Sequence, residues 1–424
     1  MEEAVMEKLE KATPRMRFSG FRDNWSMRKL KDVAEIKGRI GFRGYTVSDL
    51  VPAGQGALTI GAKHIGPAGQ LKLTDPTYLS WDKYHESPEI MIAPGDILFV
   101  QRGSLGMTAL VDEVPEPATI NPSMVIIRVS AADPAFIYQM LRGPIVQKEV
   151  EQISTATAVP MISQGQIGSF VIALPTLPEQ RKVAAFLGAV DRKIQQLERK
   201  QALLEQYKKG VVQQLFSQEL RFKREDGGEY PEWEERELGE VLTEHKLTST
   251  GTEEVYSVSV HKSLINQVEH LGRVYAAETT DHYNRVLPGD IVYTKSPTGE
   301  FKYGIIKQSR LDKAVIVSPL YGVFTPETRA LGYWLDAYFE SIANTYNYLH
   351  PIVQKGAKNT IAVTNRTFLS NKLKLPVDHD EQEKIAGFLM ALDAKVAGVA
   401  QAVAAAQQWK KGLLQQMFVW AVIP

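Results

Sequence analysis

The sequence predicts an α+β protein in which two similar globular α/β domains are separated by two long helices that pair as an antiparallel, pseudo-twofold coiled coil. The main observation is an internal repeat, because residues 178–218 and 380–420 align without a gap at an offset of 202 positions. Both copies contain Glu-Gln near the start, then Lys-Lys-Gly, and then Gln-Gln near the end. A repeat of this quality implies a chain built in the order globule, helix, globule, helix.

Each copy also carries an apolar seam with alternating spacings of four and three residues, which is typical of a left-handed coiled coil. Each helix would span roughly 60 Å. The seams are the simplest partners for each other, since each would otherwise expose a long apolar stripe; the alternative is that each helix packs on its own globule. Interruptions at Gln201, Lys208 and Lys410 would help to fix the register. The residues predicted to pair the helices or to contact a partner subunit are Phe186, Leu187, Val190, Ile194, Leu197, Leu204, Tyr207, Val211, Leu215, Phe388, Leu389, Leu392, Val396, Val399, Val403, Trp409, Leu413 and Met417.

Two matching globular segments are predicted, one before each long helix. Both begin with Arg-Phe followed by a tryptophan, and both contain Pro-Gly-Asp before an apolar run, which predicts a turn and a strand over 94–99 and 288–293. Further strands are expected at 125–127 and 315–317, and helices over 134–150 and 327–344. The predicted divisions are a leader at 1–16, domains at 17–176 and 219–377, and spacer helices at 177–218 and 378–424.

Composition excludes several classes of protein. The chain has no cysteine, so disulfides, thiolate zinc sites and cysteine nucleophiles are excluded. The formal net charge is zero, which excludes a protein covered in positive charge but allows a local basic surface. No apolar run of 18 residues and no signal peptide are found, so we expect a cytoplasmic protein with no membrane partner.

The repeated organisation suits a partner that has a two-fold repeat of its own, and double-stranded DNA is the most obvious one. The helix sequences persist between the copies, whereas the globule sequences diverge. Each globule could therefore read a different half-site, and the paired helices would set the distance between the two half-sites.

With these motifs, the chain resembles the specificity subunit of a type I restriction–modification enzyme over essentially its whole length. The most specific motifs are Pro-Glu-Gln at 178–180 and Lys-Lys-Gly-x-x-Gln-Gln-Leu-Phe at 208–216, with second copies that end at Phe418. Weaker ones are Arg17-Phe18, Trp25 and Pro-Gly-Asp at 94–96. One departure is the alanine-rich stretch 400–406, where the seam would pack less tightly.

This resemblance implies that the globules are target recognition domains, which read the two halves of a DNA site separated by a gap of fixed length. It implies no catalytic residue, no metal and no cofactor in this chain. The partners implied are two modification subunits, which bind S-adenosylmethionine and methylate adenine, and restriction subunits. The alternatives are a coiled-coil scaffold that does not read DNA and a metal-dependent nuclease.

Three sequence patterns are candidates for catalytic or metal sites. Residues 121–124 (Asn-Pro-Ser-Met) are similar to the Asn-Pro-Pro-aromatic loop of adenine methyltransferases but lack its second proline and its aromatic residue. Asp290, Glu300 and Lys302 have the residue types of a magnesium-dependent nuclease. The Pro-Gly-Asp turn recurs at 94–96 without Glu-x-Lys, which favours a structural aspartate. The eight histidines show no metal-ligand spacing.

The DNA contacts are predicted from polar side chains in loops, which can reach base edges or phosphates. The small residues near 154–157 and 355–359 would also let the backbone approach a phosphate closely. The predicted DNA-binding residues are Arg39, Arg43, Lys63, His64, Gln101, Arg102, Ser104, Ser154, Thr155, Thr157, His261, Lys262, Lys295, Ser296, Thr298, Lys302, Tyr303, Lys358 and Asn359.

Overall fold

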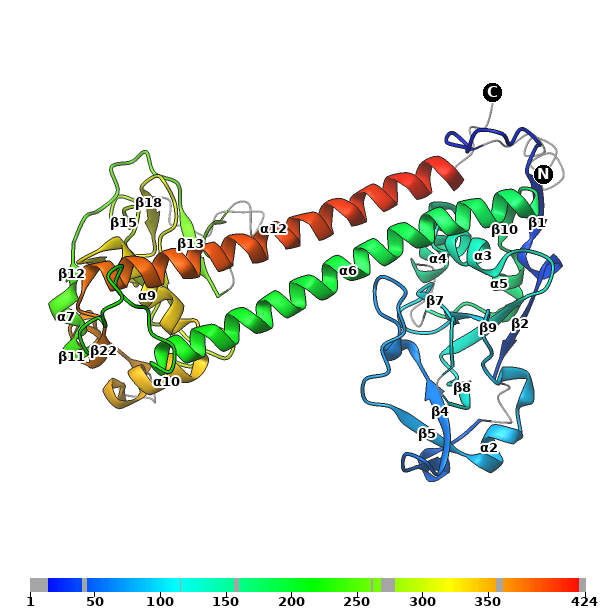
Figure 1. Ribbon diagram of the computed structural model, residues 1–424, viewed down its shortest axis with the longest axis horizontal. Coiled ribbons are helices and arrows are strands. Elements are labelled where there is room, and N and C mark those ends of the chain that lie inside the picture. The colour runs from blue at the N-terminus through cyan, green and yellow to red at the C-terminus, as the bar shows by residue number, and fades with distance from the viewer. Residues whose placement is uncertain are drawn as a thin grey trace. The chain divides into compact units, whose positions relative to one another are not determined.

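The computed structural model describes residues 14–39, 44–114, 116–155, 160–260, 262–267, 279–355 and 361–418 (Figure 1). The chain divides into two compact units, one formed by Met1–Lys200 with Val399–Pro424 and the other by Gln201–Gly398. Two 40-residue helices, α6 (Leu177–Phe216) and α12 (His379–Phe418), each contribute one half to each unit. Each unit thus holds one globule and two half-helices, and the mixed helix and sheet content confirms the α+β class.

The globule of the first unit contains two four-stranded sheets. The antiparallel sheet has the strand order β2-β9-β6-β7, and the mixed sheet has the order β3-β5-β4-β8, in which only β4 and β8 are parallel. A separate pair, β1 with β10, joins the two ends of the globule. The strands and helices of this globule are β1 (Ser26–Lys29), β2 (Ala34–Gly38), β3 (Leu50–Val51), β4 (Gly56–Ile60), β5 (Thr77–Ser80), α2 (Trp81–His85), β6 (Ile97–Val100), β7 (Thr108–Leu110), β8 (Ala118–Ile120), β9 (Met124–Val129), α3 (Pro134–Leu141), α4 (Pro144–Thr155), α5 (Gln164–Ser169) and β10 (Val171–Leu174).

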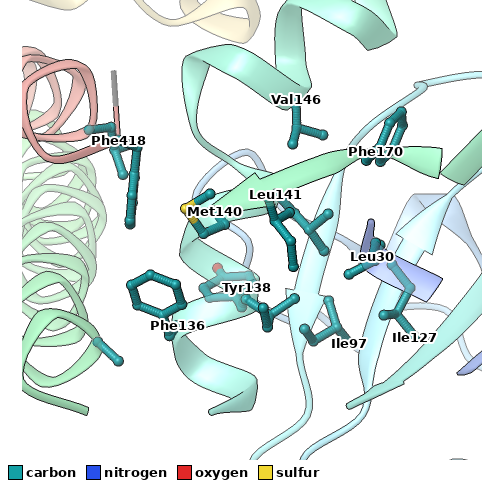
Figure 2. Packing of buried hydrophobic residues seen from close by; sticks show 14 of the residues in the cluster. Leu30, Ile97, Ile127, Phe136, Tyr138, Met140, Leu141, Val146, Phe170 and Phe418 are labelled. Atoms are coloured by element: carbon teal, nitrogen blue, oxygen red, sulfur yellow. The ribbon is translucent and has the colours of Figure 1, made fainter. Parts of the chain in front are cut away.

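Strand β6 lies between two apolar layers of this globule. Successive side chains of a strand point to opposite faces. Ile97 and Phe99 join the cluster beneath α3 and α4, whereas Leu98 joins the cluster shared with the mixed sheet. Figure 2 shows the first cluster, in which Phe136 of α3 faces Phe418 of α12 with ring centroids 5.6 Å apart. The end of α12 is therefore part of the core of this globule.

The globule of the second unit repeats the central part of this plan. Its four-stranded sheet has the order β12-β19-β16-β17, and β11 pairs with β22 as β1 pairs with β10. It has no counterpart of the mixed sheet among the described residues and contains three two-stranded sheets, β13-β14, β15-β18 and β20-β21. Its elements are β11 (Glu234–Glu237), α7 (Leu238–Val241), β12 (Leu242–Glu244), β13 (Tyr256–Ser259), β14 (Ser263–Asn266), β15 (Asn284–Val286), β16 (Ile291–Tyr293), β17 (Ile306–Gln308), β18 (Val315–Val317), β19 (Gly322–Pro326), α9 (Arg329–Phe339), α10 (Ile342–Leu349), β20 (Gln354–Lys355), β21 (Ile361–Ala362), α11 (Asn365–Leu369) and β22 (Lys372–Leu375).

The two predicted intradomain helices, at 134–150 and 327–344, are wrong as single helices, since each is a pair. The first breaks before Pro144, because proline lacks the N–H needed inside a helix and is tolerated in the first turn. The second breaks at Ser341, whose hydroxyl accepts a hydrogen bond from the backbone N–H of Asn344 and caps α10.

The Pro-Gly-Asp turn is present before β6 and before β16. Gly95 and Gly289 have φ angles of +87° and +93°, a conformation that glycine adopts without a Cβ clash. Asp96 accepts a hydrogen bond from the backbone N–H of Ala93 at 2.8 Å. Asp290 accepts the equivalent bond at 2.7 Å from Leu287. The aspartate of each copy therefore closes the turn that leads into the central strand.

The two long helices pair in an antiparallel manner within each unit. In the first unit, Val183 and Leu187 of α6 share one buried cluster with Leu413 and Met417 of α12. In the second, residues 211 and 215 of α6 share a cluster with 385, 389 and 392 of α12. The beginning of each helix thus packs with the end of the other. The same clusters contain globule residues, so pairing of the helices and packing on the globule occur together.

Reciprocal ion pairs stand at equivalent places along the helices. Lys410 of α12 binds Asp191 of α6 in the first unit, and Lys208 of α6 binds Asp393 of α12 in the second, at 2.7 Å. In this way each lysine that interrupts the seam meets a carboxylate of the facing helix, which supports its predicted effect on register. Gln201 is different, since its amide donates to Glu205 of its own helix at 2.9 Å.

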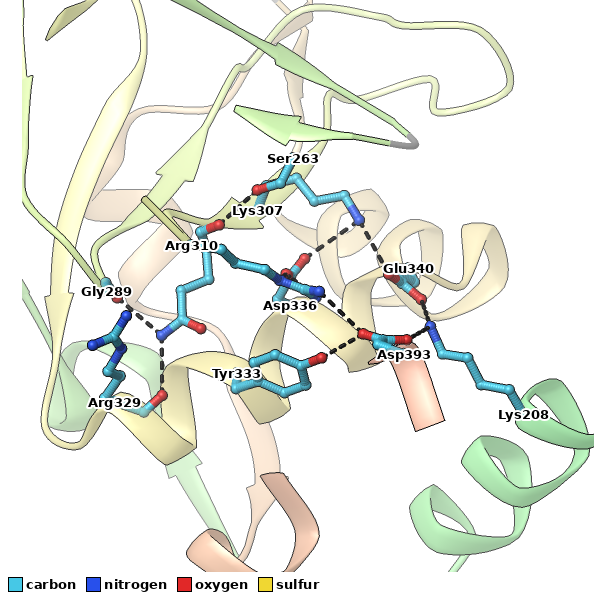
Figure 3. Close-up of polar contacts among 11 residues, drawn as sticks. Lys208, Ser263, Gly289, Lys307, Arg310, Arg329, Tyr333, Asp336, Glu340 and Asp393 are labelled. Atoms are coloured by element: carbon cyan, nitrogen blue, oxygen red, sulfur yellow. Dashed lines mark hydrogen bonds and ion pairs between the residues drawn. The ribbon is translucent and has the colours of Figure 1, made fainter. Parts of the chain in front are cut away.

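Figure 3 shows the second of these sites. Arg310 reaches Asp393 at 3.0 Å, Tyr333 donates a hydrogen bond to the same carboxylate, and Lys208 also contacts Glu340 at 3.2 Å. Burial raises the pKa of Asp393, but the hydrogen bonds from Lys208 and Tyr333 outweigh it, so that the pKa is lowered overall. The carboxylate stays ionised and holds α12 against α9.

Candidate nucleic-acid interface

Three loops of the first globule meet at one edge. The backbone N–H of Gln101, directly after β6, donates to the carbonyl of Ser123 at 2.9 Å, and that of Asn121 donates to Ile60 at the end of β4. The segment 121–123 therefore ties the loop after β6 to the loop after β4. Arg102 and Ser104 are exposed in one of these loops, and Lys63 is exposed in the other.

A cavity of about 300 Å³ opens beside two of these loops, the one after β4 and the one before β9. It is lined by polar groups of the loops after β4 and before β9, together with an aromatic ring: Tyr45, Thr59, Gly61, Ala62, Lys63, His64, Thr77, Asn121 and Ser123. Burial lowers the pKa of His64, so the ring is neutral near pH 7. The ring holds the loop, because its Nδ1 accepts a hydrogen bond from the backbone N–H of Gly61 at 3.0 Å.

Three predicted DNA contacts of the first globule are buried, and their contacts are internal. Arg39 donates to Thr119 at 3.2 Å, and Gln101 donates to the carbonyl of Pro122 at 3.0 Å. With His64 they shape the loops and do not present a free polar group, so for these three the prediction of direct DNA contact does not fit the structure. The loop pattern of the sequence does not separate such residues from exposed ones.

Other predicted contacts of this globule lie at the end of α4. Ser154 is half-buried and Thr155 is exposed, and the hydroxyl of Thr155 donates to backbone carbonyls of its own helix. Arg43 and Thr157 lie outside the described residues, as do His261, Lys358 and Asn359 of the second globule.

The second globule presents its predicted contacts in the equivalent loop, directly after β16. A tight turn, in which Thr298 and Phe301 exchange backbone hydrogen bonds of 3.0 Å, leaves Ser296 and Lys302 exposed. Lys295 is half-buried, and burial lowers its pKa although Glu244 opposes the shift. Lys262 is exposed in the β13–β14 hairpin.

An aromatic cluster supports this loop. Tyr303 stacks on Tyr346 of α10 at 5.6 Å between ring centroids, and Tyr346 stacks on His350 at 4.8 Å. The ammonium of Lys302 lies 5.9 Å from the Tyr346 ring. Tyr346 and His350 are exposed and were not among the predicted residues. Their spacing of four residues places both on one face of a helix. This spacing is the sequence feature from which the pair could have been predicted.

The nuclease pattern does not form a site. Asp290 is buried, and its carboxylate is already bonded to His245 at 2.8 Å and to Thr325 at 2.8 Å, besides the turn it closes. Glu300 and Lys302 are exposed in the loop beyond β16. No cluster of three acidic or histidine residues that could hold a metal ion exists among the described residues.

The methyltransferase-like segment is also structural. The Asn121 side-chain oxygen accepts hydrogen bonds from the backbone N–H of Ser123 at 3.0 Å and from its hydroxyl at 2.6 Å. These bonds form a turn that starts β9. Asn121 is therefore held in place with its amide group at the cavity described above.

The predicted pairing residues differ in exposure. Most of the seam is buried near the globules, while Leu197, Leu204, Val396 and Val399 are half-buried. Phe186 packs edge-on against Phe18 and Trp409, and Phe388 against Phe222. Tyr207 and Trp409, which occupy the same position of the repeat, are each 55% exposed. These two rings are thus available on the helix surface of each copy.

The two globules present exposed polar loops after equivalent strands, β6 and β16, of their four-stranded sheets. The fold is repeated, and the loops at equivalent positions carry different side chains. This arrangement is typical of a recognition protein with two binding domains.

Comparisons with known proteins find similarity to one family. Residues 81–206 match the family model of the type I restriction modification DNA specificity domain. The putative type I restriction enzyme MjaX specificity subunit of Methanocaldococcus jannaschii is 23% identical over 406 residues, which cover 88% of this chain and 87% of the relative. The MjaVIII specificity subunit of the same organism is 24% identical over 207 residues, covering 47% of each chain.

Solved structures show the same fold. The S subunit of a type I restriction–modification system from M. genitalium superposes with a TM-score of 0.59 at 14% identity, covering 96% of this chain and 99% of the other. A chain from a structural study of type I restriction–modification complex assembly gives a TM-score of 0.50 at 17% identity, covering 95% and 99%. The chain is thus similar over most of its length to specificity subunits of type I restriction–modification systems, and residues 81–206 match the model of their DNA specificity domain.

Proposed function

We propose that this chain reads a bipartite DNA site, with one half-site bound by each globule and a gap of fixed length between them. The observation that carries the proposal is the equivalence of the loops after β6 and β16. Both follow the central strand of a repeated sheet, and they hold different exposed residues, Arg102 and Ser104 in one and Ser296 and Lys302 in the other. Equivalent loops with different side chains suit two different short sequences.

The repeated helix residues support docking of two copies of one partner. Tyr207 and Trp409 are equally exposed at equivalent positions, and aromatic residues commonly dominate the energy of an interface. We infer that two modification subunits dock on the repeated helices. S-adenosylmethionine and the methylation chemistry would belong to those subunits, and restriction subunits would join through them.

Two rival functions receive less support. The nuclease would need a free carboxylate at Asp290, and that carboxylate is occupied by protein donors. A scaffold without DNA readout would not need exposed polar loops that are equivalent in position and different in sequence. We therefore take the chain to be a non-catalytic recognition subunit.

A cytoplasmic location is part of the same proposal. Helix α12 is long and apolar enough, by length and composition, to cross a membrane. However, it aligns without a gap with α6, and Asp393 and Lys410 within it are ion-paired to α6. These features favour a helix that pairs with α6 in water.

Methylome mapping tests the proposed function. A host without other modification systems would express this chain with its modification partner. Methylated adenines should then appear in one pair of short sequences separated by a constant number of base pairs. Methylation at a single uninterrupted motif, or none in the presence of an active partner subunit, would contradict the two-domain readout.

A further inference from the structure

The outward face of the first half of α6 carries an unusual set of side chains. Six of them are basic, all are exposed, and all lie in the first unit: Arg181, Lys182, Arg192, Lys193, Arg199 and Lys200. The three adjacent pairs are separated by 11 and 7 residues, which are close to three and two turns of an α-helix. They therefore form one stripe, on the side of α6 opposite its buried seam residues Val183, Leu187, Val190 and Ile194. We call these six residues the basic stripe.

Two acidic side chains in this part of α6 contact α12 and not the basic stripe. Asp191 binds Lys410, and Glu198 accepts a hydrogen bond from Gln407 of α12 at 3.0 Å. None of the six basic residues forms an ion pair with any other described residue. Arg181 and Arg192 do share a cavity of about 540 Å³ with Asp112 and Glu113 of the globule. Lys182 lies over two aromatic rings, with its ammonium 5.2 Å from the centroid of Phe18 and 5.8 Å from that of Phe21.

The second copy of the repeat lacks this stripe. The positions 202 residues further on hold Glu383, Lys384, Ala394, Lys395, Gln401 and Ala402. As a result, α6 has eight Lys or Arg against four Asp or Glu, while α12 has four of each. The lysines of Lys-Lys-Gly, the paired aspartates and the Gln-Gln pair at 213–214 are retained in both copies. The stripe is therefore suited to a ligand that contacts α6 and has no equivalent contact on α12.

This difference identifies the kind of partner. A subunit that docks on both copies would need its contact residues in both copies. DNA is bound once, and its phosphates are recognised by rows of Lys and Arg along one face of a helix. Neither globule is basic overall, since residues 20–175 have 14 Lys or Arg against 15 Asp or Glu, and residues 219–376 have 19 against 21. The stripe is a local concentration of positive charge in a chain whose formal net charge is zero.

The geometry points to the sugar–phosphate backbone of the gap as the ligand of the basic stripe, in contacts that do not depend on base sequence. This inference rests on the proposed bipartite readout, because it assigns the DNA between the half-sites to α6. From residue 181 to residue 200 the stripe is about 29 Å long, which is close to the length of one turn of duplex, about 34 Å. The row of cations can therefore follow a phosphate backbone over most of one turn.

The first test measures salt dependence. The complex of the full chain with its modification subunits would be titrated with a duplex that holds both mapped half-sites and the gap, between 50 and 200 mM salt. In the R199Q/K200Q variant the slope of log affinity against log salt should become shallower by about two, because two phosphates would no longer be neutralised. The control K374Q/K395Q removes the same charge from exposed lysines of the other unit, and Lys395 is the repeat counterpart of Lys193. Its slope should equal that of the unmodified chain.

The second test uses duplexes whose gap contains uncharged methylphosphonate linkages. These should weaken binding of the unmodified chain as the R199Q/K200Q substitution does, and the two changes combined should add little. Full additivity, or an unchanged slope in the variant with intact half-site specificity, would overturn the inference while leaving the proposed function standing. Loss of co-purifying modification subunits from the variant would also overturn it, because the stripe would then bind protein. Absence of any specific site would instead refute the proposed function itself.

Discussion

Replacing Asp191 with asparagine should destabilise the first unit more than replacing Lys410 with methionine. The two side chains form a buried ion pair between the long helices. Without the carboxylate, the ammonium of Lys410 remains buried beside Arg142, and an uncompensated buried charge costs about 3–5 kcal/mol. Without the ammonium, Asp191 still accepts from Gln139 at 2.7 Å and lies 3.5 Å from Arg142. The methionine variant should therefore lose only about 1–2 kcal/mol.

Hydrogen exchange read by mass spectrometry would measure these effects where they occur. Peptides covering residues 183–194 and 403–417 should lose protection in the order Asp191→Asn, then Lys410→Met. The double variant should be more stable than the sum predicts, with a coupling of about 0.5–3 kcal/mol. Asp393→Asn, in the other unit, is the matched control and should leave these peptides unchanged. Equal losses for the two single variants, or a loss below about 0.5 kcal/mol for Asp191→Asn, would refute the assignment of a coupled buried pair.

The same site predicts a dependence on pH. Burial, with a smaller effect of Arg142, lowers the pKa of Lys410 to about 8, from 10.5 for an exposed lysine. Between these two values the unfolded chain binds more protons than the folded one, so stability should rise as the pH increases from 8 to 10.5. Lys410→Met should abolish this part of the pH profile.

Four further substitutions test a turn, a helix position and the DNA loops, and a deletion tests the long helices. Gly95→Ala places a side chain at φ +87° with no heavy atom within 4 Å, so it should cost about 1–2 kcal/mol in denaturant unfolding through backbone strain alone, whereas Gly398→Ala inside α12 should stabilise by up to about 1 kcal/mol. Arg102→Ala and Tyr346→Ala should each weaken binding at one half-site and not the other, by about 1–3 kcal/mol in competition assays with half-site substitutions; a uniform loss on unrelated sequences would mark a phosphate contact instead. Deleting seven residues from both long helices should shorten the preferred gap, and an unchanged gap preference in methylome mapping would reject the helices as a ruler.

The long helices could be predicted from sequence because their information is local and repeated. The seam, the missing interior proline and the offset of 202 residues identify two equal helices without any knowledge of the globules. The pairing partners of Lys208 and Lys410 could not be predicted in this way. Antiparallel pairing brings each lysine beside the aspartate of the other copy, and the distance along the chain exceeds 180 residues.

The globules were harder to predict because their contacts depend on sheet topology. Residues 125–127 and 315–317 are both buried strands, as expected, but only the first lies in the four-stranded sheet. The second pairs with β15, and β19 takes the central place beside β16. Likewise, Arg39 and Gln101 have loop surroundings in the sequence but are buried by segments 80 and 21 residues away. Burial of this kind follows from long-range packing, which a one-dimensional pattern does not contain.

The internal repeat allows residues that are retained in both copies to be distinguished from residues that differ between the copies. Residues retained in both copies, such as Asp191 with Asp393 and Lys208 with Lys410, maintain the pairing of the helices or serve partners that bind twice. Under the proposed function, the residues that differ between the copies include those that face different DNA sequences at the two half-sites. The loops after β6 and β16 fall in this second group, and so does the basic stripe, although the Lys-Lys-Gly motif and the paired aspartate of the same helix are retained. Divergence of basic residues on an otherwise repeated helix is therefore the observation behind our proposal of DNA contact, and it is visible without comparing this chain with any other.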